Sequence, residues 1–173
     1  MELYNKLSKK ERIQLIEKAG EKRLTLSFYK YYQIKNTKIF RNFLFVKLNK
    51  LDVLGRIYIA KEGINAQLSL PSKNIRQLKK ILDQISLLKK IRLNVAVEHD
   101  DHSFLKLKIK LRKKIVADGL KNKDYNFDKN GFHVNAKEFN KLLMNQNTIT
   151  IDMRNHYESE IGHFEGANFC LLY

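Results

Sequence analysis

The chain is nearly without cysteine and has no long apolar run, and these absences exclude several classes of protein. Cys170 is the only cysteine among 173 residues, so neither an internal disulfide nor a cysteine-based metal cluster can form. No stretch approaches the roughly 20 apolar residues that a membrane span needs, and residues 1–23 lack the apolar core of a signal peptide. Gly-rich phosphate-binding loops, Ser-His-Asp sets and zinc-ligand spacings are also missing. We therefore expect a cytoplasmic protein and no membrane partner.

Acidic residues are few relative to basic ones. The chain has 34 Lys and Arg against 18 Asp and Glu, for a formal net charge of +16. A field of this sign attracts polyanions, and nucleic acid is the first candidate. Lysine far outnumbers arginine, however, and Asn and Ile are abundant, so a genome rich in A/T codons is an alternative source of the charge. The charge alone leaves both interpretations open.

Hydrophobic periodicity predicts a small α+β domain after a polar N-terminal helix over residues 2–22. Residues 64–70 alternate apolar and polar side chains as a half-buried strand does, and Gly63 can take positive φ in the turn before them. Ser72 is expected to cap the next helix. In chain order, the expected elements are a strand over 24–34, a helix over 38–53, strands over 56–60 and 64–70, a helix over 75–88, and strands over 92–98 and 104–112.

The order β-α-β-β-α-β, with one added strand, predicts a ferredoxin-like (split βαβ) domain, an antiparallel sheet with two helices on one face. We place this basic domain at residues 24–119, after a helical appendage at 1–23. A polar linker is expected over 120–135. The remaining region, 136–173, is expected to hold a helix over 136–144, a strand over 148–153 and a loop or short helix over 154–161.

A basic strand is the main candidate for contact with nucleic acid. Strict alternation over 104–112 puts Lys106, Lys108 and Lys110 on one face, a geometry suited to phosphates, although a merely solvated face is the alternative. Three tyrosines either stack unpaired bases or cover the core, and the sequence does not decide between these roles: they are Tyr29, Tyr31 and Tyr58. The predicted RNA-binding residues are Lys30, Lys61, Lys106, Lys108, Lys110, Arg112, Lys113 and Lys114.

The C-terminal region carries the sharpest local motif. A strand ending in Asp152-Met-Arg154 is followed by Glu158 and then by Gly-His-Phe-Glu-Gly-Ala-Asn over 162–168. These spacings resemble the first segment of a rhodanese-like α/β domain, whereas on their own they indicate only a strand, a turn and a surface ion pair. The resemblance implies that the Asp-x-Arg pair orders the loop after the strand, and that the glycine-flanked segment is a tight turn leading into a helix. The predicted structural residues of this motif are Asp152, Arg154, Glu158, Gly162, His163, Gly166 and Ala167.

Longer matches extend the resemblance over most of the chain. Ala-Lys-Glu-Gly-Ile-Asn-Ala at 60–66 and Asp-Met-Arg-Asn-His-Tyr-Glu at 152–158 are long and specific. With the segments 28–31 and 108–119 they resemble the rhodanese-domain tRNA uridine(34) hydroxylase family, from about Thr25 to Asn168. The resemblance implies hydroxylation of uridine at C5 at the tRNA wobble position, with tRNA as partner and molecular oxygen as co-substrate. It also implies an RNA-binding or accessory role for the first domain. It identifies no cofactor and no electron donor.

One feature of that family is not found in these residues. Family members use an essential cysteine in a Cys-x-Gly-Gly-x-Arg loop, and no such segment occurs among the 173 residues. Cys170 directly follows the Gly-Ala-Asn turn and has no Gly-rich loop around it, so we do not expect it to be a nucleophile. We therefore predict no catalytic residue, a chain truncated within its rhodanese-like domain, and no activity of the chain alone. A tRNA-binding module and a non-functional remnant are the alternatives.

Two smaller expectations concern histidines and apolar residues. His99 and His102 lie beside Asp100 and Asp101 in a polar turn, where solvated side chains are more common than a metal site, so we predict no metal. The region after residue 120 has few elements to cover its apolar side chains. We expect the following to be partly exposed: Phe139, Leu142, Leu143, Ile149 and Ile151.

Overall fold

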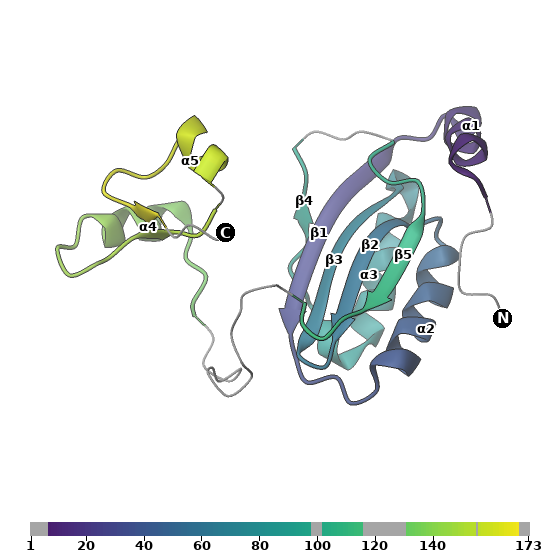
Figure 1. The fold of residues 1–173 in the computed structure, drawn as a ribbon, viewed down its shortest axis with the longest axis horizontal. Coiled ribbons are helices and arrows are strands. Elements are labelled where there is room, and N and C mark those ends of the chain that lie inside the picture. The colour runs from purple at the N-terminus through teal and green to yellow at the C-terminus, as the bar shows by residue number, and fades with distance from the viewer. Residues whose placement is uncertain (1–6, 98–101, 116–130, 155, 170–173) are drawn as a thin grey trace. The chain divides into compact units, whose positions relative to one another are not determined.

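The computed structural model describes residues 7–97, 102–115, 131–154 and 156–169. The chain forms two compact units, Met1–Ala117 and Asp118–Tyr173 (Figure 1). Several predictions fall outside the described residues, namely those on Cys170, on His99 with Asp100 and Asp101, on the turn at 117–119 and on most of the linker.

The first unit is an α+β domain built on a five-stranded sheet with the strand order β4-β1-β3-β2-β5. Four strands pair antiparallel in the ferredoxin-like order, and β5 pairs parallel with β2 at the edge. The fold class predicted for this domain is therefore confirmed. Its elements are α1 (Lys9–Ala19), β1 (Arg23–Tyr31), α2 (Thr37–Asn49), β2 (Leu54–Ala60), β3 (Gly63–Pro71), η1 (Ser72–Asn74), α3 (Ile75–Gln84), η2 (Ser86–Leu88), β4 (Asn94–Val95) and β5 (Leu107–Leu111).

Three sequence-based predictions were wrong in detail. The strand expected over 92–98 shrinks to Asn94–Val95, which pair only with Ser27 and Leu26. The sheet is not wholly antiparallel, because β5 runs parallel to β2. Ser72 does not cap a helix: its hydroxyl donates to the Lys22 carbonyl at 2.7 Å, within the 3₁₀ turn before α3.

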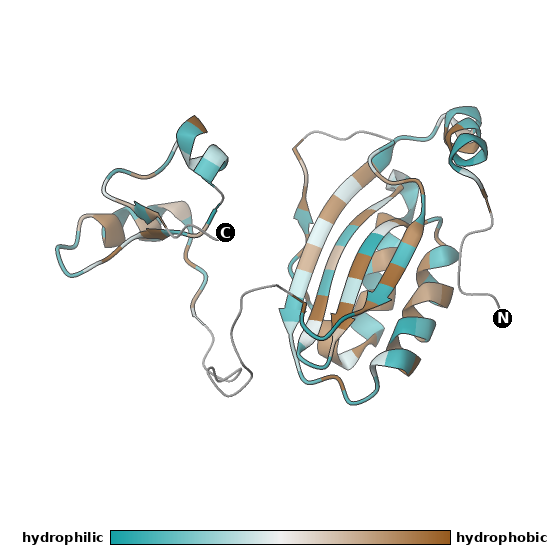
Figure 2. Cartoon of the chain, in the orientation of Figure 1, coloured by the Kyte–Doolittle hydropathy of each residue, from teal (hydrophilic) through white to brown (hydrophobic). Residues whose placement is uncertain are grey.

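Helices α2 and α3 cover one face of the sheet and form the core with it. Figure 1 shows both helices behind the sheet. Apolar residues alternate with polar ones along the strands (Figure 2), so each strand turns one set of side chains toward the helices. The buried side chains that meet in this core include Leu44, Leu48, Leu78, Ile57 and Ile59. Each contributes about 1.5–3 kcal/mol by leaving water. Among the described residues of this unit, no helix covers the opposite face of the sheet.

The β2–β3 hairpin forms where the sequence predicted it, and Gly63 has the positive φ that was expected. Ala60 pairs with Gly63 across a two-residue turn of Lys61 and Glu62. Gly63 has φ 152°, and a Cβ there would lie 2.2 Å from the Lys30 carbonyl oxygen. Because β1 approaches the turn so closely, no other residue fits at this position without displacing backbone.

Helix α1 is attached to the sheet through one acidic side chain. Ser8 and Glu11 form a capping box at its start. Arg12 of α1 and Arg23 of β1 both contact the Asp52 carboxylate, at 3.1 and 2.9 Å. Arg23 also donates to the Ser69 hydroxyl at 3.1 Å, so this cluster joins the helix, β1 and β3.

The second unit contains α4 (Ala136–Leu143), β6 (Ile151–Asp152), α5 (His156–Ile161) and β7 (Asn168–Phe169). Strands β6 and β7 pair parallel. The glycine-flanked turn therefore leads into a strand, not into the helix that the rhodanese resemblance implied, because the Asn168 amide donates to the Thr150 carbonyl at 2.9 Å. The strand expected over 148–153 is reduced to two residues.

Apolar side chains of this second unit are poorly covered, as expected from its few elements. Ile149 and Ile151 are 76% and 58% exposed, and Leu142 is also exposed. Phe139 and Leu143 are half-buried.

Candidate nucleic-acid interface and the Asp152–Arg154 site

The sheet face opposite α2 and α3 carries two rows of polar and aromatic side chains, which we call the open face. The first row crosses four strands through directly paired residues: Tyr29 pairs with Asn65, Asn65 with Tyr58, and Tyr58 with Lys110. The flanking residues Phe28, Ile57 and Ile109 are buried in the core. Since side chains alternate along a strand, the four residues of the row point away from the helices.

The second row is parallel to the first and lies two residues away from it on each strand. Ser27 pairs with Gln67, Gln67 with Arg56, and Arg56 with Lys108. Arg56, Gln67 and Lys108 are exposed. Like charges directly opposite each other on a sheet repel, so the Arg56–Lys108 pair is a position that an anion would stabilise.

Arg112 extends the basic edge beyond β5. Its backbone amide donates to the Ile59 carbonyl at 2.8 Å, and its guanidinium lies 5.2 Å from the centre of the Tyr58 ring. A cation over an aromatic face is favourable. The contact therefore holds a positive charge beside Tyr58.

A buried carboxylate fixes the segment that follows Arg112. Glu62 is only 4% exposed, and its Oε1 accepts a hydrogen bond from the Ile115 amide at 2.8 Å. The same turn accepts from Tyr32 and Ile34 through the carbonyls of Glu62 and Lys61. Glu62 thus ties residues 112–115 to the β2–β3 hairpin.

The structure gathers some of the predicted RNA-binding residues and separates others. Lys108 and Lys110 lie on the open face. Lys61 is exposed in the β2–β3 turn, and Lys106 precedes β5 instead of belonging to it. Lys30 is half-buried and alternates with Tyr29, so it does not belong to the open face. Arg112, Lys113 and Lys114 directly follow β5.

The sequence reasoning missed Arg56, Asn65 and Gln67. Arg56 lies two residues before Tyr58 on the same strand, so the two side chains point to the same face. This alternation is visible in the sequence and could have identified Arg56. Asn65 and Gln67 belong to the face only through their pairing with β1 and β2, which no local pattern specifies.

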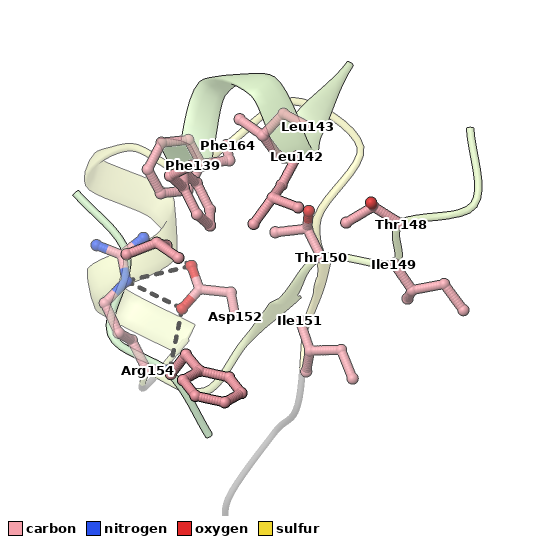
Figure 3. Close-up of a pocket in the computed structure, with 12 residues that line it drawn as sticks. Phe139, Leu142, Leu143, Thr148, Ile149, Thr150, Ile151, Asp152, Arg154 and Phe164 are labelled. Carbon is pink, nitrogen blue, oxygen red and sulfur yellow. Dashed lines mark hydrogen bonds and ion pairs between the residues drawn. The ribbon is translucent and has the colours of Figure 1, made fainter. Parts of the chain in front are cut away.

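In the second unit, Asp152 and Arg154 form a tight ion pair. Arg154 donates from its Nε to Asp152 Oδ1 at 3.0 Å and from a terminal guanidinium nitrogen to Oδ2 at 2.6 Å. The Arg154 backbone amide donates to the same carboxylate at 3.0 Å. The guanidinium also donates to the Gly162 carbonyl at 2.7 Å, which closes the loop between them. Figure 3 shows this pair beside the side chains of the unit's open cavity.

These contacts change the acidity of both partners. Side-chain hydrogen bonds from Arg154, followed by the bond from its backbone amide, lower the pKa of Asp152 from 3.8 to about 2. The side-chain hydrogen bond to Asp152 raises the pKa of Arg154. The pair is therefore charged at neutral pH.

The other motif residues build the turn around this pair. His163 Nδ1 lies 2.9 Å from the Ser159 carbonyl, and the ring meets Phe169 edge-on. Gly166 has φ 71°, and the Ala167 amide donates to the Phe164 carbonyl at 3.1 Å. Glu158 is half-buried in α5. This geometry is that of a structural loop and positions no nucleophile among the described residues.

The cavity next to this loop is open and mainly apolar. It measures about 550 Å³ and includes Phe139, Leu142, Ile151 and Phe164 in its lining (Figure 3). Across the described ranges, no group of three or more His, Cys, Asp or Glu side chains could hold a metal ion. Within the same ranges no helix has the length and apolar character to cross a membrane.

Comparison with known proteins agrees with the resemblance stated from the sequence. A family model described as the UPF0176 acylphosphatase like domain matches residues 23–115. The tRNA uridine(34) hydroxylase of Leptospira interrogans is 47% identical over 165 residues, which cover 95% of this chain and 45% of the relative. The proteins of the same name from Photorhabdus laumondii and Buchnera aphidicola are 44% and 46% identical over 166 residues, 95% of this chain and 47% and 51% of theirs.

The chain thus spans about half the length of the curated relatives it matches. The identity extends through both structural units, and the matched domain coincides with the five-stranded sheet. The chain therefore belongs to the family of the UPF0176 acylphosphatase like domain, which residues 23–115 match, and it is similar in sequence to tRNA uridine(34) hydroxylases over both of its units.

Proposed function

We propose that this chain serves tRNA modification, the oxygen-dependent hydroxylation of uridine 34 at C5, and that its first unit holds the tRNA. The names of its relatives support the reaction. The observation that carries the role of the first unit is the open face, where Arg56, Lys108 and Lys110 come together on the neighbouring strands β2 and β5 at one edge of the sheet. A protein with a net charge of +16 attracts the tRNA backbone over a long range, and such a surface gives it a place to bind.

The second unit is proposed to be the opening part of a rhodanese-like domain. Its Asp152–Arg154 pair and the Gly162 carbonyl hold the loop after β6 in a defined shape. No Cys-x-Gly-Gly-x-Arg segment occurs in the 173 residues, and Cys170 is the only thiol. If the family reaction depends on a cysteine in such a segment, residues 1–173 bind tRNA without hydroxylating it.

A chimera tests both halves of this proposal. Residues 1–168 would be joined to the part of the Leptospira interrogans relative that follows the matched region, and expressed in a bacterium that lacks tRNA uridine(34) hydroxylase. We expect mass spectrometry of tRNA nucleosides to find 5-hydroxyuridine with the chimera and none with residues 1–173. Hydroxylation by residues 1–173 would contradict the proposal that these residues bind tRNA without modifying it. A folded chimera that makes no product would count against the proposed function.

A further inference from the structure

We propose that the open face is a stacking surface for unpaired RNA bases, with Tyr29 and Tyr58 as its two platforms, and that it binds an RNA loop in preference to a duplex. The inference rests on the proposed function, because it names the part of the tRNA that the first unit recognises. From the sequence alone, these tyrosines could either stack on bases or pack in the core. Their positions in the sheet favour base stacking.

Neither tyrosine is a core residue of the first unit. Tyr29, near the end of β1, is 56% exposed, whereas Leu26 and Phe28 on the same strand are buried. Tyr58 is half-buried between the core residues Ile57 and Ile59. Both rings therefore lie on the side of the sheet away from α2 and α3. An exposed aromatic ring on a sheet is a sequence-tolerant platform because every base has a π face.

The distance between the platforms suits more than one nucleotide. Tyr29 is on β1 and Tyr58 on β2, with Asn65 of β3 between them in direct register. Neighbouring strands lie about 4.8 Å apart, so the two tyrosines are separated by roughly 10 Å. The Asn65 amide between them offers both a donor and an acceptor, the combination that a base edge requires.

Charge lies on one side of this row. Lys110 on β5 is paired with Tyr58 and Lys108 lies two residues away on the same strand, while the Arg112 guanidinium lies over the Tyr58 ring, so cations at this end of the row can meet the phosphates of an RNA strand. RNA supplies both the anions that these cations attract and the flat rings that the tyrosines can stack on. A duplex supplies phosphates but keeps its bases within the stack, so it cannot use the tyrosines.

The test uses residues 1–173 and two fluorescein-labelled RNAs with equal numbers of phosphates, a hairpin with a uridine-containing loop and a blunt duplex. Affinities are measured by fluorescence anisotropy at low salt. We expect the wild type to prefer the hairpin. Tyr29→Ala and Tyr58→Ala should each weaken hairpin binding about 5-fold or more and leave duplex binding unchanged.

Matched variants separate stacking from folding. Tyr29→Phe keeps the ring and should bind the hairpin as the wild type does. Tyr32→Ala removes a tyrosine of similar exposure, 47%, that lies just beyond the end of β1, and should change nothing. Because Tyr58 is half-buried, Tyr58→Phe serves as its second variant, and circular dichroism checks that each protein is folded.

Two results would overturn the inference in distinguishable ways. If the alanine variants bind the hairpin as the wild type does, or weaken hairpin and duplex equally, base stacking is wrong while the proposed role in tRNA binding stands. If the wild type binds neither RNA nor whole tRNA, both the stacking surface and the proposed function of the first unit fail.

Discussion

At the residue scale, Asp152 has a carboxylate whose pKa is lowered strongly by its contacts. Its carboxylate accepts several hydrogen bonds from Arg154 and lies nearly out of solvent. The pKa of Asp152 in the folded protein, about 2, is below its ordinary value of 3.8. A group whose pKa falls on folding contributes stability above its unfolded pKa and loses it as the pH drops through the folded value.

We therefore expect the ion pair to contribute its full stability above about pH 4 and progressively less between about pH 4 and pH 2, while the pair itself stays charged until the pH nears 2. Carboxyl carbon chemical shifts measured by NMR against pH report this directly. The Asp152 midpoint should lie near 2 in the wild type and return toward 3.8 in Arg154→Ala. A wild-type midpoint near 3.8 would show that the pair does not form in solution.

Gly63 gives a second prediction at this scale. Its positive φ and the nearby Lys30 carbonyl leave no room for a Cβ, so Gly63→Ala should lower the free energy of unfolding by about 1–3 kcal/mol or more. Gly20→Ala is the matched control, because Gly20 also has positive φ, 59°, but nothing lies within 4 Å of the added atom. Urea unfolding compares the two, and an equal loss in both variants would mean that the close approach to β1 is unimportant.

At the element scale, the β2–β3 hairpin organises the basic edge of the sheet. Glu62 accepts from the Ile115 amide and so fixes the segment that carries Arg112, Lys113 and Lys114. Glu62→Ala and Glu62→Gln have the same charge, but only Gln keeps an oxygen that can accept this hydrogen bond. The difference between these two variants therefore isolates the positioning effect.

We expect Glu62→Ala to bind tRNA more weakly and with a salt slope smaller by about 1 to 2, because one or two phosphate contacts are lost. Glu62→Gln should keep the wild-type slope. Filter binding at several salt concentrations measures both. A Glu62→Ala protein that binds more weakly with an unchanged slope would indicate partial unfolding and not lost positioning.

The elements also show which features of the fold the sequence patterns could predict and which they could not. The ferredoxin-like order, α2, α3 and the β2–β3 hairpin followed from period and turn chemistry, which are local properties. The parallel pairing of β5 did not, because alternation is the same in parallel and antiparallel strands and the partner is set by tertiary packing. The contribution of Asn65 and Gln67 to the open face depends on cross-strand register, which the linear pattern does not specify.

At the scale of the whole molecule, charge and position together support the account. Codon bias would enrich lysine everywhere, whereas the proposed RNA contact depends on the few cations at one edge of the open face. Lys79 and Lys80 are exposed on α3, the layer that covers the other face of the sheet. Replacing them removes two positive charges away from the open face, so they are suitable controls for a general effect of net charge.

The most direct measurement is a salt series of tRNA binding by residues 1–173, by Lys108→Ala/Lys110→Ala and by Lys79→Ala/Lys80→Ala. The account predicts wild-type affinity that falls steeply with salt, and a slope smaller by about 2 in the β5 variant alone, since each lost phosphate contact removes about 1 from the slope. No binding at low salt, or equal slopes in the β5 and α3 variants, would contradict the claim that the open face holds the tRNA.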